Sequence, residues 1–150
     1  VAGGKSILRP NAGACQALQS GAKRLETAMT TPTIVDFRRN MKGEESAPAP
    51  DRVLKGEPKT SARNYFSDPS GQFFAGTWSS TVGKWKIDYT ENEFCHLLEG
   101  RVVITSAEGK RWQFNAGDAW VIPAGFSGTW ETVEPARKRY AIFEAAKPAG

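Results

Sequence analysis

Two short segments carry the side chains that are best suited to chemistry. Glu93 and Cys95 are two positions apart, and Lys138 and Tyr140 have the same spacing. Side chains alternate between the two faces of a β-strand, so each pair would share a face if its segment is a strand. A positioned carboxylate can act as a general acid or base, and a thiol becomes a nucleophile when its pKa is lowered. These segments are therefore the first candidates for a site.

The elements that would position them are short strands. Between residues 73 and 143, runs rich in aromatic and β-branched residues alternate with turn signals such as Gly100, Gly117 and the pair Glu134-Pro135. About eight strands at roughly ten-residue spacing predict an antiparallel sandwich or barrel, which also removes exposed sheet edges. The predicted strands are Phe73–Trp78, Lys84–Tyr89, Glu93–Leu98, Val102–Thr105, Arg111–Phe114, Trp120–Ile122, Gly128–Thr132 and Lys138–Phe143.

Two motifs stand out in this region. The first is Glu93-Phe-Cys-His-Leu-Leu-Glu-Gly100, and the second is Gly117-Asp-Ala-Trp-Val-Ile-Pro123-Ala-Gly125. Both resemble the conserved motifs of the cupin superfamily. Residues 62–143 resemble the small single-domain cupins of unknown function near the ureidoglycine aminohydrolase-like and ethanolamine-utilisation cupins. The resemblance implies an all-β fold, an antiparallel cupin jelly-roll barrel, in which the motif glutamate Glu93 points inward together with Cys95.

The rest of the chain divides by composition. We expect residues 1–28 to be an extension or leader, with either a short helix over Ala14–Leu25 or no fixed structure. Residues 29–61 should form an N-terminal strand at Thr33–Phe37, followed by a wrapping segment that contains Gly, Pro and charged residues without periodicity. Residues 62–146 would then be the cupin domain.

The resemblance does not extend to the metal ligands. Metal-binding cupins usually use three His and one Glu, whereas this chain contains one His in all. The first two ligand positions fall within Lys86–Tyr89 and the third falls on a glycine. His96 has the wrong parity to face Glu93. We predict no metal and no cofactor; the alternative is a weak oxygen-ligand site made by Glu93 with Asp88 or Tyr89.

An inward Glu93 without a metal needs another partner, because a buried unpaired carboxylate is costly or becomes protonated. We hypothesise that Lys138 approaches Glu93 and that these two residues are catalytic; the alternative is that Lys138 is an exposed basic residue. The ligand-binding residues expected around them are Tyr89, Cys95, Trp130 and Tyr140. For the aromatic residues the alternative is core packing or a subunit interface, and for Cys95 it is simple packing.

These expectations lead to two functional hypotheses. The first is a small-molecule-binding cupin of undetermined chemistry, with a pocket inside the barrel centred on Glu93. The second is a metal-independent or weakly metal-dependent enzyme in which Glu93 is a general acid or base. Its substrate would be a small polar metabolite such as a ureido compound, an amino acid derivative or a carboxylate, a class that rests on the resemblance alone.

Composition narrows the choice of partners. The net charge is +4, but Arg137-Lys138-Arg139 cannot form one basic face on a strand, so we expect no nucleic-acid partner. No apolar run approaches the roughly 20 residues of a membrane span, so we expect no membrane partner. The two cysteines, Cys15 and Cys95, give no disulfide framework, which favours the cytoplasm. Surplus aromatic strands and the segment Thr33–Phe37 predict a homodimer.

Overall fold

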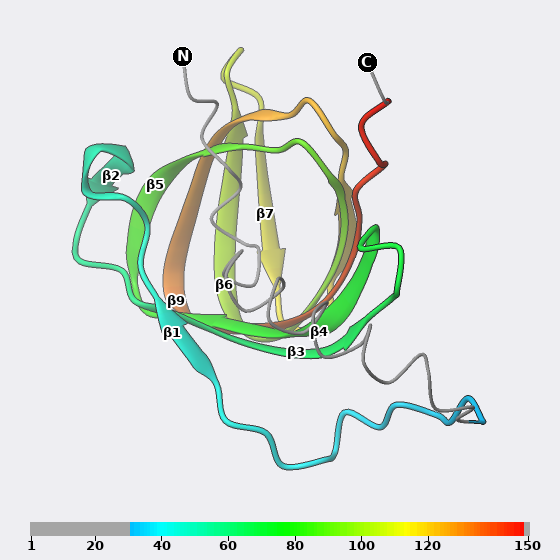
Figure 1. Cartoon of the computed structure of the whole chain (residues 1–150). Helices are drawn as coiled ribbons and strands as arrows, with labels where there is room; N and C mark the ends of the chain where they lie inside the picture. Colours follow the sequence, from blue (N-terminus) through cyan, green and yellow to red (C-terminus); the bar gives the residue numbers. More distant parts are fainter. Residues whose placement is uncertain (1–30, 149–150) are drawn as a thin grey trace.

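The computed structural model describes residues 31–148, and nearly all of their regular structure is β (Figure 1). The elements are β1 Glu44–Ser46, a 3-10 turn η1 Pro50–Arg52, β2 Val53–Lys55, β3 Thr60–Ser67, β4 Phe73–Ser80, β5 Gly83–Asp88, β6 Asn92–Ser106, β7 Arg111–Asn115, β8 Ala119–Ile122 and β9 Ser127–Phe143. All strand pairs are antiparallel, and the sheet curls around a common interior (Figure 1). The predicted all-β jelly-roll class is confirmed.

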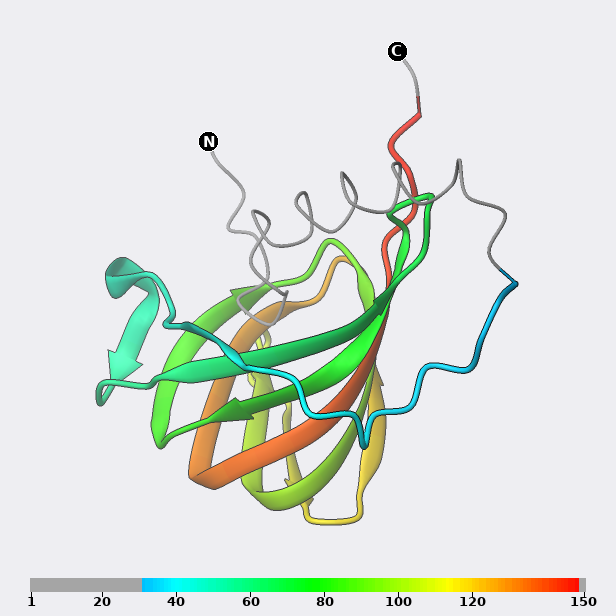
Figure 2. The ribbon, with the colours of Figure 1, turned by 60° about the horizontal axis from the view of Figure 1, so that its bottom comes forward.

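The long strand β9 holds the barrel together. Its first part, residues 127–132, pairs with β5, and its second part, residues 136–143, pairs with β4. Strand β6 runs antiparallel to β9 along almost its whole length and also pairs with β7 and β8. Figure 2 shows β3 and β4 beside the orange-red second part of β9. Together, β6 and β9 therefore pair with β4, β5, β7 and β8 as well as with each other.

Bulges replace two turns that the sequence predicts. Gly100 lies inside β6, and Glu134-Pro135 lies inside β9, so four predicted strands merge into two long ones. The pairing of β6 with β9 shifts register between Leu97 and Val102, which bends both strands without ending them. Gly100 has φ +86°, and a Cβ there would lie 2.2 Å from the carbonyl oxygen of Pro135. Glycine is thus required at this position for a bulge rather than for a hairpin turn.

The N-terminal strand prediction is wrong. The segment Thr33–Phe37 forms no strand, and the first strand of the described chain is β1. The Asp36 carboxylate accepts a hydrogen bond from the Arg38 backbone N–H at 2.8 Å, and the Asp36 carbonyl accepts one from Arg39 at 3.1 Å. This Asx-type turn ends the extended run. The expected extension 1–28, for which the alternatives were a short helix at Ala14–Leu25 or no fixed structure, lies outside the described residues.

Strand alternation separates the interior from the surface as expected. Lys138 is fully buried, while its neighbours Arg137 and Arg139 are exposed. The apolar core contains a cluster of three tryptophans, Trp78, Trp85 and Trp130, whose ring centroids are 5.3–6.3 Å apart.

Within the described residues, no helix is long and apolar enough to cross a membrane.

Candidate functional site

The centre of the barrel contains a buried ion pair. The Nζ of Lys138 lies 2.6 Å from Oε1 of Glu93, and neither side chain has any exposed surface. The same Nζ lies 3.4 Å from the Sγ of Cys95, which is also fully buried. The contact expected between Lys138 and Glu93 is therefore present, and the alternative of an exposed lysine is wrong. The catalytic roles assigned to the two residues stay predictions.

Strand register explains why a lysine is needed for this contact. Lys138 is the cross-strand partner of Leu97, whereas Glu93 lies four residues away along β6, opposite Ile142. Four residues of strand correspond to about 13 Å, so only a long side chain can bridge this diagonal. Cys95 faces the same interior between them, and its small side chain leaves room for the lysine stem. Cys95 thus has the packing position that the sequence predicts as one of its alternatives.

Two tryptophan rings complete the surroundings of the ammonium group. Lys138 Nζ lies 4.9 Å from the ring centroid of Trp78 and 4.8 Å from that of Trp130. A cation that has lost its water gains from such ring faces, and gains more from a paired carboxylate. The Trp130 indole donates a hydrogen bond to Thr132 Oγ1 at 3.0 Å, and that hydroxyl bonds to Ser80 Oγ at 3.1 Å. Both the cation and the indole N–H of Trp130 are therefore already partnered.

Burial shifts the pKa values of the groups around this ion pair. Burial, followed by the negative charge of Glu93, raises the pKa of the Cys95 thiol far above its usual range. The pKa of Tyr89 is raised for the same two reasons. Burial alone would lower the pKa of Lys138, but Cys95 and Glu93 outweigh it and raise that pKa. At neutral pH the site thus holds a neutral thiol, a neutral phenol and a charged ammonium, and Cys95 is not an activated nucleophile.

The remaining predicted residues lie around the pair but are part of the packed interior. Tyr140 is 2 % exposed and donates a hydrogen bond to Asn64 Oδ1 at 3.0 Å. Tyr89 is also 2 % exposed and follows β5, where its backbone bonds to the loop before β9. His96 is half-buried on the other face of β6, opposite Ala119 and Arg139, as its parity predicts.

The residues present do not fit the metal centre that the cupin resemblance implies. Among the described residues there is no group of three or more His, Cys, Asp or Glu side chains that could hold a metal ion. The ammonium of Lys138 occupies the side of Glu93 where a cation would bind. Asp88, an alternative oxygen ligand, is 47 % exposed and pairs with Arg52. We therefore derive no chemistry through a metal.

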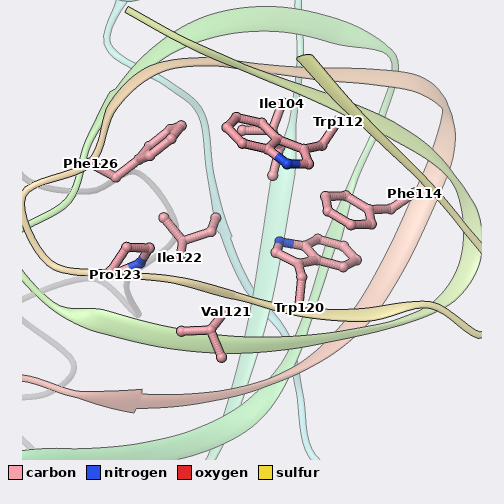
Figure 3. Close-up of a pocket in the computed structure, with 8 residues that line it drawn as sticks. All are labelled: Ile104, Trp112, Phe114, Trp120, Val121, Ile122, Pro123 and Phe126. Atoms are coloured by element: carbon pink, nitrogen blue, oxygen red, sulfur yellow. The ribbon is translucent and has the colours of Figure 1, made fainter. Parts of the chain in front are cut away.

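A cavity of about 400 Å³ opens beside this ion pair. Figure 3 shows the eight residues that line it, which come from β6, β7, β8 and the loop after β8. They are Ile104, Trp112, Phe114, Trp120, Val121, Ile122, Pro123 and Phe126. None of the six predicted site residues is among them. The cavity nevertheless adjoins the ion pair, because Ile122 is the cross-strand partner of Glu93 and Trp120 is that of Cys95.

Sequence reasoning missed most of this lining. Trp112 and Phe114 alternate on β7, as Trp120 and Ile122 do on β8, so each pair shares a face. This signal is visible in the sequence. However, it does not say that the two faces meet, because β7 and β8 both pair with β6 and are not hydrogen-bonded to each other.

The curled antiparallel barrel with Glu93 buried inside it is the arrangement that the cupin resemblance implies. Residues 67–140 match the family model described as the EutQ-like cupin domain. The likeness proposed from the two motifs is thereby confirmed. No curated protein sequence matches the chain at a significant level.

Solved structures agree with this assignment. A protein of unknown function of the DUF861 family from Pseudomonas syringae pv. tomato is 27% identical, with a TM-score of 0.64, over 72% of this chain and 46% of that one. The chain therefore spans less than half of that protein. A putative ethanolamine utilization protein Q from Salmonella typhimurium (22% identity, TM-score 0.52, 58% and 71% of the two chains) shares the fold. So does the EutQ protein of Clostridium difficile (17% identity, TM-score 0.53, 67% and 74%).

The buried ion pair leads to a prediction about stability. Lys138→Met should lower the free energy of unfolding by about 3–5 kcal/mol, because it leaves the Glu93 carboxylate buried without a cation. Adding Glu93→Gln to that variant should recover at least about 1 kcal/mol, since no buried charge remains. Urea unfolding monitored by tryptophan fluorescence measures both changes.

The neighbouring position provides a matched control for this prediction. Arg137 pairs with Glu99 at 2.9 Å on the surface, with both side chains partly exposed. Arg137→Met should therefore change the free energy of unfolding by less than about 1 kcal/mol. A Lys138→Met variant as stable as Arg137→Met would contradict the structural role of the pair.

Proposed function

We propose that this protein is a small-molecule-binding cupin whose ligand occupies the aromatic cavity beside the Glu93–Lys138 pair. The observation that supports this proposal is the cavity itself. Its volume of about 400 Å³ falls within the roughly 300–1,000 Å³ typical of small-molecule sites. Its wall of aromatic and aliphatic side chains is also typical of such sites.

The ion pair would then form the base of the site rather than its centre. Glu93 and Cys95 lie beside Ile122 and Trp120 on the neighbouring strand, so a ligand in the cavity would contact the cross-strand neighbours of the pair and not the pair itself. Both charged groups are without exposed surface, and they pair through Lys138 Nζ and Glu93 Oε1, whereas Glu93 Oε2 has no hydrogen-bond partner among the described residues. In this arrangement the pair holds β6 and β9 together, and the ligand is bound by β7, β8 and the loop that follows.

Filling the cavity should abolish binding. In a screen of small apolar and polar compounds, we expect wild-type hits that shift the indole N–H resonances of Trp112 or Trp120 in ¹H–¹⁵N spectra. Ile104→Phe adds volume inside the cavity and should remove these shifts while leaving the unfolding temperature within a few degrees. Val82→Phe, at a position that is 47 % exposed and outside the cavity, is the control and should bind as the wild type does. If no compound binds, or if hits bind equally well to Ile104→Phe, the proposal fails.

The alternative function is a metal-independent enzyme that acts on a small polar metabolite. One observation favours it: Tyr89, Cys95 and Lys138 have shifted pKa values around Glu93, and such clusters are common at active sites. In that case Glu93 would be the general base, and Lys138 would hold its charge. Catalysis would require the side chains that cover the pair to move, because neither charged group is exposed.

The enzyme alternative predicts turnover that depends on Glu93. Incubation with ureido compounds, amino acid derivatives and small carboxylates, followed by mass spectrometry, would detect product. Glu93→Gln should then lower kcat by at least about 100-fold, as expected for loss of a general base. Circular dichroism would confirm that the variant is folded. Turnover that survives in Glu93→Gln would contradict this assignment.

We also propose that the chain pairs with a second copy through an outer-face patch. Cross-strand partners on the outer face form one apolar row, Val121–Phe94–Ala141–Ala75–Phe66, across β8, β6, β9, β4 and β3. Phe73 and Phe143 lie opposite each other beside this row. Phe94 is 48 % exposed and Val121 is 59 % exposed. These seven residues constitute the outer-face patch.

The size of the outer-face patch suits a dimer. Aromatic side chains bury roughly 150–250 Å² each when covered, so the patch exposes on the order of 400 Å² of apolar surface. That is about half of the roughly 800 Å² per partner in a stable interface. Neighbouring polar residues such as Arg139 and His96 would supply the rim. Because the patch crosses the two central strands, a two-fold arrangement would bring Phe94 against the same surface of its partner.

A charge at the centre of the outer-face patch should produce monomers. Light scattering coupled to size exclusion should give twice 16.4 kDa for the wild type and 16.4 kDa for Phe94→Glu. Val82→Glu places the same charge on an exposed apolar position outside the patch and should remain dimeric. A monomeric wild type would contradict the proposal, as would a dimeric Phe94→Glu variant.

Two further proposals concern nucleic acid and the location of the protein. We propose no nucleic-acid partner, because the basic run is divided between a buried Lys138 and an Arg137 that pairs with Glu99. The buried free thiol of Cys95 suits a reducing compartment such as the cytoplasm.

A further inference from the structure

The chemistry of the cavity wall restricts what it can bind. Four of the eight lining residues are aromatic, and none carries a charge: Ile104, Trp112, Phe114, Trp120, Val121, Ile122, Pro123 and Phe126. A charged or strongly polar molecule would lose its hydration there and find no ion pair in return. The wall therefore selects against the polar metabolites that the cupin resemblance implies.

The aromatic rings of the cavity wall favour a planar ligand. Phe114 and Trp120 are stacked almost parallel, with ring centroids 3.9 Å apart and planes at 7°. Trp112 and Phe126 meet edge to face at 6.2 Å and 62°. Aromatic rings prefer offset stacking and edge contacts with further rings. A planar ring system can therefore continue these contacts within the available volume.

One polar group of the wall lacks a partner. The indole nitrogen of Trp120 is buried and has no hydrogen-bond acceptor among the described residues. In Figure 3 the indole nitrogens of Trp112 and Trp120, drawn in blue, lie on the facing edges of the two rings. The Trp130 indole, by contrast, is bonded to Thr132. An acceptor on the ligand would satisfy the Trp120 donor, and buried donors are normally satisfied.

We infer that the ligand is a flat, uncharged compound of one or two aromatic rings that carries a hydrogen-bond acceptor, such as a carbonyl oxygen, as a substituent on its ring. The ring occupies the aromatic space, and the acceptor receives the Trp120 N–H. This inference rests on the proposed binding function and specifies the chemical class of its ligand.

Three probes of similar size test the inference on the full chain. Acetophenone has a ring and a carbonyl, ethylbenzene has the ring alone, and hydantoin is a small cyclic ureido compound. Titrations followed by the tryptophan indole resonances in ¹H–¹⁵N spectra should show that acetophenone binds and shifts the Trp120 resonance most. Ethylbenzene should bind at least about fivefold more weakly, since it lacks the acceptor. Hydantoin should bind more weakly than both.

A variant separates the hydrogen bond from the ring contact. Trp120→Phe keeps an aromatic side chain but removes the donor, so acetophenone and ethylbenzene should then bind equally. Trp85→Phe is the matched control: its indole nitrogen is also buried and without a partner, but it lies outside the cavity. This control should keep the wild-type preference. The comparison of the probes on the wild type stands even if Trp120→Phe fails to fold.

The outcomes distinguish the inference from the function on which it rests. If hydantoin binds in the cavity more tightly than acetophenone, the ligand class is wrong while the binding function stands. Equal binding of acetophenone and ethylbenzene by the wild type would also overturn the inference, because the Trp120 donor would then have no role. If none of the probes binds and the compound screen also finds no ligand, both proposals fail.

Discussion

The barrel depends on one buried charge pair. Burying Glu93 or Lys138 alone would cost several kcal/mol, so each residue is compatible with the core only because the other is present. The pair does more than neutralise charge. Lys138 belongs to β9 and Glu93 to β6, and these two long strands connect all the remaining strands except β1, β2 and β3 directly. A diagonal contact between them fixes their register at the centre, next to the bulges where backbone pairing is irregular.

The lysine also decides what kind of site the barrel offers. A metal centre would bring a cation with open coordination positions into the interior, and Glu93 would face its substrate. Here the cation is covalently part of β9, and its ammonium is surrounded by a carboxylate, a thiol and two indole rings. Neither charged group has exposed surface that a ligand could contact. The cavity lies instead between β7, β8 and the loop that follows β8, and its wall is apolar.

Sequence reasoning reached the fold and the interior pair for physical reasons. The resemblance of the two motifs to those of cupins implied the inward face of β6. A buried carboxylate needs a cation, and Lys138 was the best candidate because it begins a strand in a segment that shares the resemblance. It did not reach the cavity. Whether Trp112 and Trp120 face the same space depends on how β7 and β8 curve away from β6, and a local pattern carries no information on curvature. It also placed turns at Gly100 and Pro135, because a bulge and a hairpin need the same residue types.

A comparison of the two groups of aromatic residues indicates where ligand chemistry can vary. Trp78 and Trp130 pack against the ammonium of the ion pair and Trp85 packs against both rings, so changes there would disturb the surroundings of the buried charges. Phe114, Trp120 and Phe126 are partly buried residues that pack against this core from one side. Their free sides face the cavity, so substitutions among them would alter its shape while the pair stays covered. Because the ion pair and the cavity wall are made by different residues, substitutions in the wall could change what such a cupin binds while the ion pair keeps the fold intact.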